Sequence, residues 1–378
     1  MKDKARVGVI GCGAISGAYL AMAANFPILQ IAACADLDMS RAKAAADKYQ
    51  IPRACTVDEI LADDSIEIVL NLTIPKAHVP IGLRAIEAGK HMYSEKPLGI
   101  DREEGRRLIM AARGRQVRVG CAPDTFMGAG LQTARKLIDD GSIGRPVAFT
   151  AFMMCPGHES WHPNPEFYYE PGGGPMFDMG PYYLTALLNL LGPVRRISGM
   201  ATIAIPQRTI THTDRTTGAA GPKFGRRIHV QTPDHICGMI EFVNGCAGTI
   251  VTSFATRFAT YDAAQPITIY GTEGTLRVPD PNRFDGPVHL RRNSDADWTQ
   301  IPPAFVQGYG RAVGLADMAA AIRSGRAHRA SGDQAFAVLD LMQGFLDSSE
   351  QGSMYLPSTT YTRPNPMRAD LPFGILDD

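Results

Sequence analysis

The chain has 378 residues, a length that predicts two domains rather than a single core. Its composition, with 45% hydrophobic and 20% charged residues, is typical of a soluble globular enzyme. Because 38 Lys and Arg residues balance 38 Asp and Glu residues, the charge does not favour nucleic acid or an anionic membrane surface as a partner.

The cysteine pattern and the first residues of the chain indicate in which cellular compartment the protein is expected. Seven cysteines are scattered along the chain without a CxxC pair, so neither a disulfide framework nor a zinc site is predicted. The first predicted strand starts by residue 6, which leaves no room for a secretion signal, and no segment approaches about 18 consecutive apolar residues. We therefore expect a cytoplasmic protein without a membrane partner.

A strand, a glycine-rich turn and a helix are predicted at the start of the chain. Residues 6–20 read RVGVIGCGAISGAYL, an apolar run followed by glycines and then by helical spacing. Gly11 permits a tight turn, and Gly13 has no Cβ to hold a diphosphate away from the backbone. Ala14 and Ile15 lie at the helix start, where the helix dipole favours negative charge. The pattern predicts a dinucleotide-binding turn; for the glycines alone, a turn that only packs tightly is the alternative.

An acidic residue follows the next predicted strand. That strand covers residues 29–35 and ends at Asp36, about 20 residues after the glycines. A carboxylate at this position bonds the adenosine ribose hydroxyls and repels a 2′-phosphate. The spacing therefore predicts NAD as the cofactor, while Arg41 nearby keeps NADP open as the alternative.

The order of the predicted elements indicates two kinds of domain. Strands alternate with helices up to residue 122, which predicts a parallel, doubly wound α/β sheet in a domain over 1–122. After a helix at 129–140, consecutive hairpins with an Asn244-Gly245 turn predict a largely antiparallel sheet in an α+β domain over 123–352. Residues 353–378 are rich in proline and are expected to form an extended tail. The predicted strands are 6–10, 29–35, 66–73, 90–95, 117–121, 147–154, 195–204, 234–243, 246–256 and a hairpin over 266–278, and two late helices are predicted over 311–323 and 333–348.

Two further stretches carry groups capable of chemistry. Glu95-Lys96-Pro97 leaves a predicted strand at the carboxyl edge of the parallel sheet, where ligands of such sheets bind. Asp178 and Tyr182 are four residues apart, so on one helix a carboxylate and a phenol would share a face. Pro181 removes a helical hydrogen bond and is expected to bend or restart that helix. A solvated lysine and a tyrosine packed in the core are the structural alternatives.

The glycine turn, Glu95-Lys96-Pro97, the segment with Asp178 and Tyr182, and the Asn244-Gly245 hairpin occur in an order and spacing that resembles the Gfo/Idh/MocA oxidoreductase family. The resemblance covers nearly the whole chain. It implies a Rossmann domain followed by a domain with an open, mostly antiparallel sheet, through which homodimers or homotetramers assemble. It also implies hydride transfer between nicotinamide and a secondary alcohol of a sugar, cyclitol or related polyol.

The same resemblance assigns roles to three residues. Lys96 takes the place of the family lysine that contacts the reacting hydroxyl and the nicotinamide ribose, and Asp178 takes the place of the helix aspartate. The commonest family pattern has histidine where this chain has Tyr182, which resembles the branch with glucose–fructose oxidoreductase and dimeric dihydrodiol dehydrogenase. A phenol with an ordinary pKa of about 10 needs nearby positive charge to act as a base. We expect Tyr182 as acid/base and Lys96 as polariser, with the reverse assignment left open.

Further cofactor contacts follow from topology and from the resemblance. Thr73 and Pro75 end the third strand beside the nicotinamide half, and Glu95 precedes the lysine. His78 matches a family histidine near a helix start. A histidine that caps a helix is the alternative for His78.

The string His158-Glu159-Ser-Trp161-His162 satisfies the HExxH pattern of zinc proteases. That pattern binds metal only on a helix, and prolines on both sides exclude one here, so no metal site is predicted. We expect a loop over the substrate pocket, whose His158, Trp161 and His162 bond sugar hydroxyls and stack on a ring face. A surface loop without a ligand role is the alternative. Asp124, after the fifth strand, is a weaker candidate for a substrate contact.

These observations predict an NAD-dependent dehydrogenase that acts on a sugar, glycoside or cyclitol. A trans-dihydrodiol substrate, or a tightly held cofactor that cycles between two sugars, is the second hypothesis within enzymes. A non-catalytic regulator of the same fold that senses NAD or a sugar is the alternative from another class. Lys96 and Tyr182 argue against it, since a sensor does not need proton-transfer groups.

Overall fold

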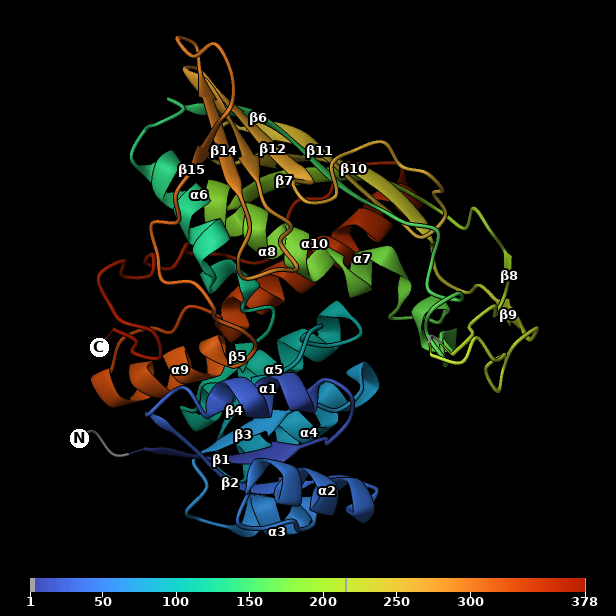
Figure 1. The fold of residues 1–378 in the computed structure, drawn as a ribbon, viewed down its shortest axis with the longest axis vertical. Coiled ribbons are helices and arrows are strands. Elements are labelled where there is room, and N and C mark those ends of the chain that lie inside the picture. The colour runs from blue at the N-terminus through green and yellow to red at the C-terminus, as the bar shows by residue number, and fades with distance from the viewer. Residues whose placement is uncertain (1–3, 215, 378) are drawn as a thin grey trace.

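The first part of the chain forms a five-stranded parallel sheet. The computed structural model describes residues 4–214 and 216–377. The strand order is β2-β1-β3-β4-β5, so the direction of winding reverses between β1 and β3, at the edge where ligands of such sheets bind (Figure 1). All five predicted strands are present, although the third to fifth are shorter than predicted. They are β1 (Ala5–Ile10), β2 (Leu29–Ala35), β3 (Ile68–Asn71), β4 (His91–Ser94) and β5 (Val119–Cys121).

Helices cover both faces of this sheet because its strands are apolar almost throughout. The core positions of β1 and β3, such as Val7, Val9 and Leu70, are fully buried, as expected for strands packed on two sides. Side-chain caps define three of the helix starts, at Asp38, Thr56 and Asp101. The helices are α1 (Ser16–Ala23), α2 (Met39–Tyr49), α3 (Val57–Ala62), α4 (Pro75–Glu87) and α5 (Arg102–Arg115).

The second sheet has eight strands and is mostly antiparallel. Its order is β15-β14-β13-β12-β6-β11-β10-β7, and β6 pairs with β11 in parallel while the other neighbours are antiparallel. The Asn244-Gly245 turn joins β10 to β11, as predicted. The strands are β6 (Pro146–Met154), β7 (Val194–Thr202), β10 (His235–Phe242), β11 (Ala247–Ser253), β12 (Ile267–Gly271), β13 (Gly274–Val278), β14 (Val288–Arg292) and β15 (Thr299–Ile301).

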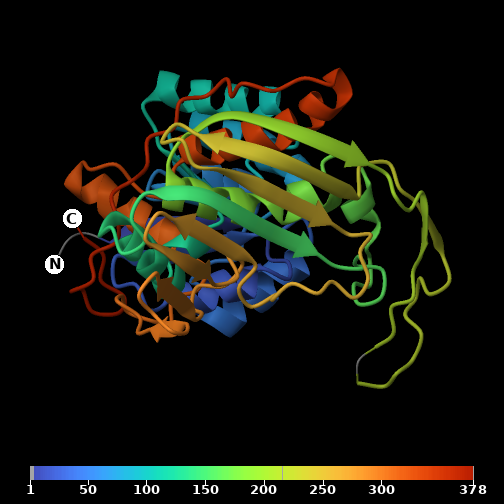
Figure 2. The ribbon, with the colours of Figure 1, turned by 90° about the horizontal axis from the view of Figure 1, so that it is seen from above.

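Four short strands were not predicted. Besides β14 and β15 at the sheet edge, β8 (Gln207–Thr209) and β9 (Arg227–His229) pair in an arm that extends beyond the large sheet (Figures 1 and 2). These strands are short and contain many polar residues, so they lack the apolar alternation that indicates a strand.

Helices lie between the two sheets. Figure 1 shows α8 and α10 under the large sheet and above the first domain, whereas Figure 2 shows the opposite face of that sheet uncovered. α9 and the start of α10 contact the first domain, and Ser331 forms a β-bridge with Gly120 of β5. The division at residues 122 and 352 stays a prediction. The remaining helices are α6 (Ala129–Asp139), α7 (Gly174–Asp178), α8 (Gly180–Leu191), α9 (Val313–Ser324) and α10 (Gly332–Gln351), with short 3-10 turns η1 (Thr125–Met127) and η2 (Glu166–Tyr169).

The last segment, residues 353–377, follows the surface without a helix or a paired strand of its own. Ion pairs hold it to the body, as between Arg363 and Asp139 at 2.7 Å and between Arg329 and Asp377 at 2.7 Å. Within residues 4–214 and 216–377, none of the helices is both long and apolar enough to cross a membrane.

Candidate active site

The glycine turn between β1 and α1 leaves its backbone open on one side. Gly11 has φ +103°, and a Cβ there would lie 2.7 Å from the carbonyl group of Leu72, so a side chain is excluded on both counts. A Cβ on Gly13 would meet nothing within 4 Å, which leaves the backbone open to a ligand. α1 starts directly after Ile15 and has no side-chain cap; the N–H groups of Ser16 and Ala18 donate to the carbonyl oxygens of Gly13 and Ile15, and the helix dipole favours negative charge at this end.

Asp36 lies beside this turn. Its Oδ2 accepts a hydrogen bond from the Cys12 N–H at 2.8 Å, and its Oδ1 accepts one from the Asp38 N–H at 2.9 Å. Arg41 lies 3.6 Å from the carboxylate of Asp38 and is exposed. Leu37 is fully exposed, which places an apolar side chain next to the Asp36 carboxylate at the sheet's carboxyl edge.

His78 braces the two loops that follow β3 and β4. The side chain is 1% exposed, with Nδ1 at 2.7 Å from the Pro97 carbonyl oxygen and Nε2 at 3.0 Å from the Thr73 carbonyl oxygen. Burial lowers its pKa, although the two carbonyl groups favour the protonated ring. His78 lies within the first turn of α4, which begins at Pro75. Its ring therefore positions Thr73 and the lysine loop; a cofactor contact by His78 stays a prediction.

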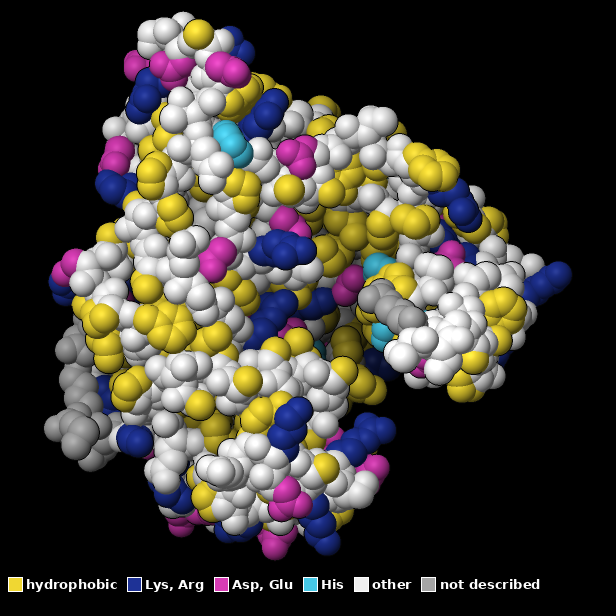
Figure 3. All heavy atoms as spheres, viewed as in Figure 1, with side chains coloured by type: hydrophobic (Ala, Val, Ile, Leu, Met, Phe, Trp, Pro, Cys, Tyr) yellow, Lys and Arg dark blue, Asp and Glu magenta, His cyan; other side chains and the backbone are white. Residues whose placement is uncertain are grey.

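Lys96, Asp178 and Tyr182 meet between the two domains. Lys96 Nζ donates to the carbonyl oxygen and to Oδ1 of Asp178, both at 2.8 Å, and lies 5.2 Å from the centre of the Tyr182 ring. Asp178 ends α7, and Pro181 lies in the first turn of α8, so the helix restarts as predicted. The two side chains thus come from different helices. Figure 3 shows the region as a hollow with basic, acidic and histidine side chains.

The ion pair controls the charge of both partners. Burial disfavours the charge on Asp178, but Lys96 outweighs it and lowers the pKa of that carboxyl well below its usual value. Burial likewise opposes the charge on Lys96, and the Asp178 carboxylate raises the lysine pKa above its usual value. Lys96 therefore keeps its proton at neutral pH.

Tyr182 has a partner that sequence reasoning missed. Its hydroxyl oxygen accepts a hydrogen bond from Arg311 Nη2 at 2.8 Å, and the Arg311 guanidinium lies 5.3 Å from the ring centre. Burial raises the pKa of Tyr182, and Lys96 and Arg311 oppose this. Arg311 was predicted to start a helix, but α9 begins at Val313 because Ala312 has φ +88°. No motif marks Arg311 in the sequence.

Asp124 lies behind Arg311 rather than in the open part of the site. It is 0% exposed, and its Oδ2 accepts hydrogen bonds from the N–H groups of Ala312 at 3.1 Å and Gly314 at 3.0 Å. Its Oδ1 is 3.8 Å from Arg311 Nη1. Burial raises the pKa of Asp124 to about 6. Asp124 thus holds the start of α9; a substrate contact by this residue stays a prediction.

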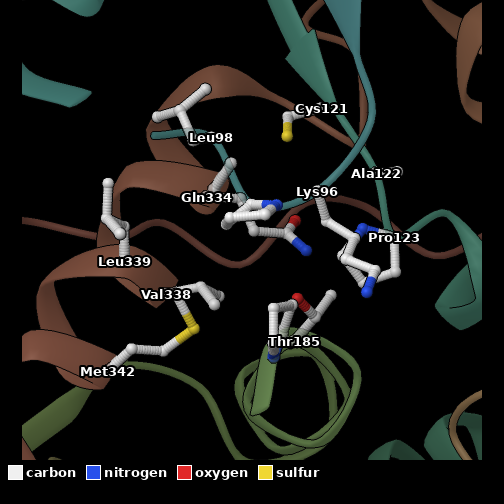
Figure 4. Close-up of a pocket in the computed structure, with 13 residues that line it drawn as sticks. Lys96, Leu98, Cys121, Ala122, Pro123, Thr185, Gln334, Val338, Leu339 and Met342 are labelled. Atoms are coloured by element: carbon white, nitrogen blue, oxygen red, sulfur yellow. The ribbon is translucent and has the colours of Figure 1, made fainter. Parts of the chain in front are cut away.

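The Glu95 carboxylate accepts two hydrogen bonds from other residues of the first domain. Its Oε1 accepts from the Tyr19 hydroxyl at 2.8 Å and its Oε2 from the Lys96 N–H at 3.0 Å, so it fixes the lysine loop to α1. Behind the lysine, a small cavity is bounded by the loops after β4 and β5 and by α8 and α10 (Figure 4). Thr185 and Gln334 line it with polar side chains, together with Lys96 itself.

The two histidines of the HExxH string have different surroundings. Residues 158–162 form a turn and not a helix. His158 Nε2 is 3.3 Å from Asp178 Oδ2, and Trp161 Nε1 donates to His158 Nδ1 at 3.2 Å. Because an indole N–H only donates, His158 Nδ1 is the acceptor and Nε2 carries the proton toward Asp178. His162 instead accepts from the Asn164 N–H at 3.0 Å, away from this chain of bonds.

Glu159, the acidic residue of that string, also has hydrogen-bond partners within the protein. Glu159 Oε1 lies 2.9 Å from Arg208 Nη1, and its other oxygen accepts from the Tyr169 hydroxyl. Arg208 reaches it from the arm and also binds Asp234 at 2.8 Å. The arm therefore holds the loop beside the site. Among residues 4–214 and 216–377, no three His, Cys, Asp or Glu side chains form a group able to hold a metal ion.

Models of two domains of one protein family match the chain. The one described as "Oxidoreductase family, NAD-binding Rossmann fold" matches residues 5–122, and the one described as "GFO/IDH/MocA C-terminal domain" matches residues 131–277. Together they cover well over half of the sequence.

Named relatives and solved structures agree with these matches. A 1,5-anhydro-D-fructose reductase from Ensifer adhaerens is 27% identical over 79% of this chain and 84% of its own length. A trans-1,2-dihydrobenzene-1,2-diol dehydrogenase from Bos taurus is 24% identical over 81% of this chain and 84% of its own. A structure of levoglucosan dehydrogenase with NADH and L-sorbose superposes with a TM-score of 0.79, at 23% identity, over 95% of this chain and 100% of that one.

Proposed function

Since the chain belongs to the Gfo/Idh/MocA oxidoreductase family, we propose that it oxidises a secondary alcohol of a sugar, glycoside or cyclitol with NAD. The proposal is carried by one observation, the meeting of Lys96, Asp178 and Tyr182 at the carboxyl edge of the Rossmann sheet. Relatives named as reductases or dehydrogenases of sugars and diols support the substrate class.

The residues of the first domain fit NAD. The turn of Gly11, Gly13, Ala14 and Ile15 would hold the diphosphate, because Gly13 faces open space and α1 lacks a side-chain cap. Asp36 would accept from the ribose hydroxyls, and the loops at Thr73, Pro75 and Lys96 end strands on the nicotinamide side. Exposed Leu37 and Ile74 would cover apolar faces of the cofactor. When bound, NAD accepts the hydride that leaves the alcohol carbon.

A substitution at Asp36 tests the cofactor preference. Asp36→Asn keeps an oxygen for the Cys12 N–H but removes the negative charge that repels a 2′-phosphate. We expect the ratio of NADH to NADPH affinity to fall by about tenfold or more. Fluorescence titration with each cofactor measures the ratio. Asp38→Asn is the matched control, since Asp38 pairs with exposed Arg41, and an equal change in both variants would contradict the assignment.

The proton of the alcohol is handled by Tyr182 and Lys96. Lys96 stays protonated beside Asp178, so it polarises the alcohol oxygen as a donor. Tyr182 first loses its own proton to solvent, and the phenolate then accepts the alcohol proton as the C–H bond breaks; in the reverse direction the neutral phenol donates that proton. Asp178 orients Lys96 on one side and accepts from His158 on the other.

Aromatic side chains beside the site favour a ring-shaped substrate. Trp161 is 43% exposed and Phe167 is 47% exposed, so both rings can be reached by a ligand. His158 lies 5.0 Å from Trp161 and 4.2 Å from Tyr168, measured between ring centres. We assign His158 and Trp161 to the sugar hydroxyls and ring face, and His162 to the outer side of the same cluster.

The same aromatic cluster supports a second candidate. A trans-dihydrodiol carries two adjacent hydroxyls on an unsaturated ring, which Trp161 and Tyr168 could stack against. The relative named as a dihydrodiol dehydrogenase supports this substrate class. A sugar presents several more hydroxyl groups, so substrate preference distinguishes the two.

A substrate screen tests the proposed function. Purified protein is incubated with aldoses, anhydrosugars, cyclitols and trans-diols, each with NAD and with NADP, and nicotinamide reduction is followed by absorbance. Turnover of a sugar or cyclitol with NAD supports the first candidate, and turnover of diols alone supports the second. Tight NADH binding without turnover of any alcohol would favour a sensor and overturn the proposal.

The uncovered face of the large sheet is proposed to bind a second copy of the chain. Met200 on β7, Met239 on β10 and Tyr270 on β12 are 70%, 56% and 40% exposed on this face, which Figure 2 shows without a covering helix. Met239→Glu is expected to shift sedimentation toward monomer, because it places a charge in an apolar contact. A wild-type protein that sediments as a monomer at all concentrations would contradict the dimer or tetramer.

A further inference from the structure

The phenol of Tyr182 is bonded by an arginine that no motif indicates. Arg311 Nη2 is 2.8 Å from the Tyr182 hydroxyl oxygen, and the arginine side chain is only 13% exposed. Lys96 lies 5.2 Å from the ring centre of Tyr182, and the Arg311 guanidinium lies at 5.3 Å. A single buried phenol is thus in contact with two cations.

We infer that Arg311 is the positioning residue that makes Tyr182, and not Lys96, the proton acceptor of the reaction. The inference rests on the proposed dehydrogenase function. Arg311 acts through Tyr182, because its guanidinium bonds the phenol oxygen and the substrate is met by the phenol.

The hydrogen-bond inventory gives the first argument. A guanidinium group only donates, so the oxygen of Tyr182 is the acceptor in its bond with Arg311. The proton of the phenol must therefore point elsewhere, and the oxygen is free to exchange it with an alcohol. In the phenolate form the same bond becomes charge-assisted and stronger. Arg311 thus stabilises the form of Tyr182 that accepts a proton.

The arrangement of Lys96 gives the second argument. Two of its three N–H groups already go to Asp178, at 2.8 Å each, and that carboxylate favours the charged ammonium. An ammonium has no lone pair, so Lys96 can offer one remaining N–H but cannot receive a proton. Polarisation of the alcohol oxygen is the role left to it.

The charges around Tyr182 come from every element that packs on it. Lys96 and Glu95 face it from the loop after β4, Asp178 from the end of α7, and Arg311 from the turn before α9. Burial raises the pKa of Tyr182 most, the two cations lower it and the two carboxylates raise it, and the net pKa lies above the usual value for tyrosine. Lys96 has the larger of the two lowering effects on the pKa, and Arg311 adds a second positive charge that is bonded directly to the phenol oxygen. Two groups lie farther out, Tyr168 of η2 and Asp124 behind the arginine.

The turn before α9 holds Arg311 in place. Asp124 Oδ2 accepts from the N–H groups of Ala312 and Gly314, and its Oδ1 faces Arg311 Nη1 at 3.8 Å. Ala312 has φ +88°, a left-handed conformation that a residue with a side chain rarely adopts. Such a turn persists only where its surroundings determine it, and here it directs the guanidinium toward the phenol.

The test is the pH profile of alcohol oxidation with Arg311→Gln and Arg311→Lys. We expect the apparent pKa of the rate-controlling base to rise by about one to two pH units in Arg311→Gln, as for loss of a hydrogen bond to a charged group. The rate at neutral pH should fall about tenfold to 100-fold and recover at high pH. Arg311→Lys keeps the positive charge and should shift less. A uniform loss across all pH values, or an unchanged profile, would overturn the inference.

A second measurement does not need turnover. Ultraviolet titration of tyrosinate in the wild type, minus that in Tyr182→Phe, isolates the ionisation of Tyr182. The same difference is then taken between Arg311→Gln and the double variant Arg311→Gln/Tyr182→Phe. Its titration midpoint should lie at higher pH than in the wild-type background. Arg102→Gln is the matched control, because Arg102 also lies over a tyrosine ring, 4.8 Å from that of Tyr355, outside the site. If no alcohol is turned over, the proposed function fails while this titration still decides the effect of Arg311.

Discussion

Tyr182→Phe is expected to lower kcat for alcohol oxidation by about 100-fold to 10,000-fold, the range for loss of a positioned acid/base. The variant removes only the hydroxyl that accepts from Arg311, and the ring keeps its contacts with Lys96 and Arg311. NADH affinity should change little, because the phenol belongs to the second domain. Steady-state kinetics on the best alcohol and an NADH titration measure the two quantities.

Tyr183→Phe is the matched control for that variant. Tyr183 is the next residue of α8, and its hydroxyl donates to the Phe152 carbonyl oxygen at 3.1 Å, outside the cluster of Lys96 and Asp178. We expect it to keep kcat near the wild-type value. A Tyr182→Phe variant as active as the control would return the acid/base role to another group and refute the assignment.

Lys96→Met is expected to reduce kcat/KM as strongly and also to destabilise the fold. Methionine keeps the length of the side chain but leaves the Asp178 carboxylate without its cation. Removing one member of a largely buried pair costs about 3 kcal/mol of unfolding free energy. Kinetics and urea denaturation of the same preparation measure the two effects.

The loss of stability in Lys96→Met should depend on pH. In the wild type the pKa of Asp178 is lowered in the folded state, so its stabilising effect is present above its unfolded pKa of about 3.9 and is lost as the pH falls. The difference from Lys96→Met should therefore be larger at neutral pH than at pH values well below about 3.9, where the folded wild type begins to protonate Asp178. Lys90→Met is the control, since Lys90 is also buried but donates to the carbonyl oxygens of Asp63 and Ile66. An equal loss of kcat/KM in both variants would contradict a role for Lys96 in the reaction.

Short-range patterns predicted the fold of the first half of the molecule correctly. The turn at Gly11 and Gly13 and the acid at Asp36 are encoded within one βαβ unit, where each residue acts on its near neighbours. The restart of the helix at Pro181 was likewise a local consequence, because proline lacks the N–H that a continuous helix needs. The four short polar strands carried no such signal.

The site of the second half was predicted only in part. Both histidines of the HExxH string looked equivalent, yet His158 faces Asp178 while His162 binds the backbone at Asn164. Asp178 and Tyr182 were expected on one helix face, and they instead approach Lys96 from two separate helices. Which side chains a turn directs inward depends on packing partners that its own residues do not specify.

By itself, the sequence determined the type of the two domains, the glycine turn between the first strand and helix, and the presence of a lysine, a carboxylate and a phenol that can take part in acid/base chemistry. Only the tertiary structure decided how they are combined, because Lys96 and Asp178 are 82 residues apart and Tyr182 and Arg311 are 129 apart. Contacts over such separations arise when sheets and helices pack and bury these groups together, and no periodicity or local propensity records them.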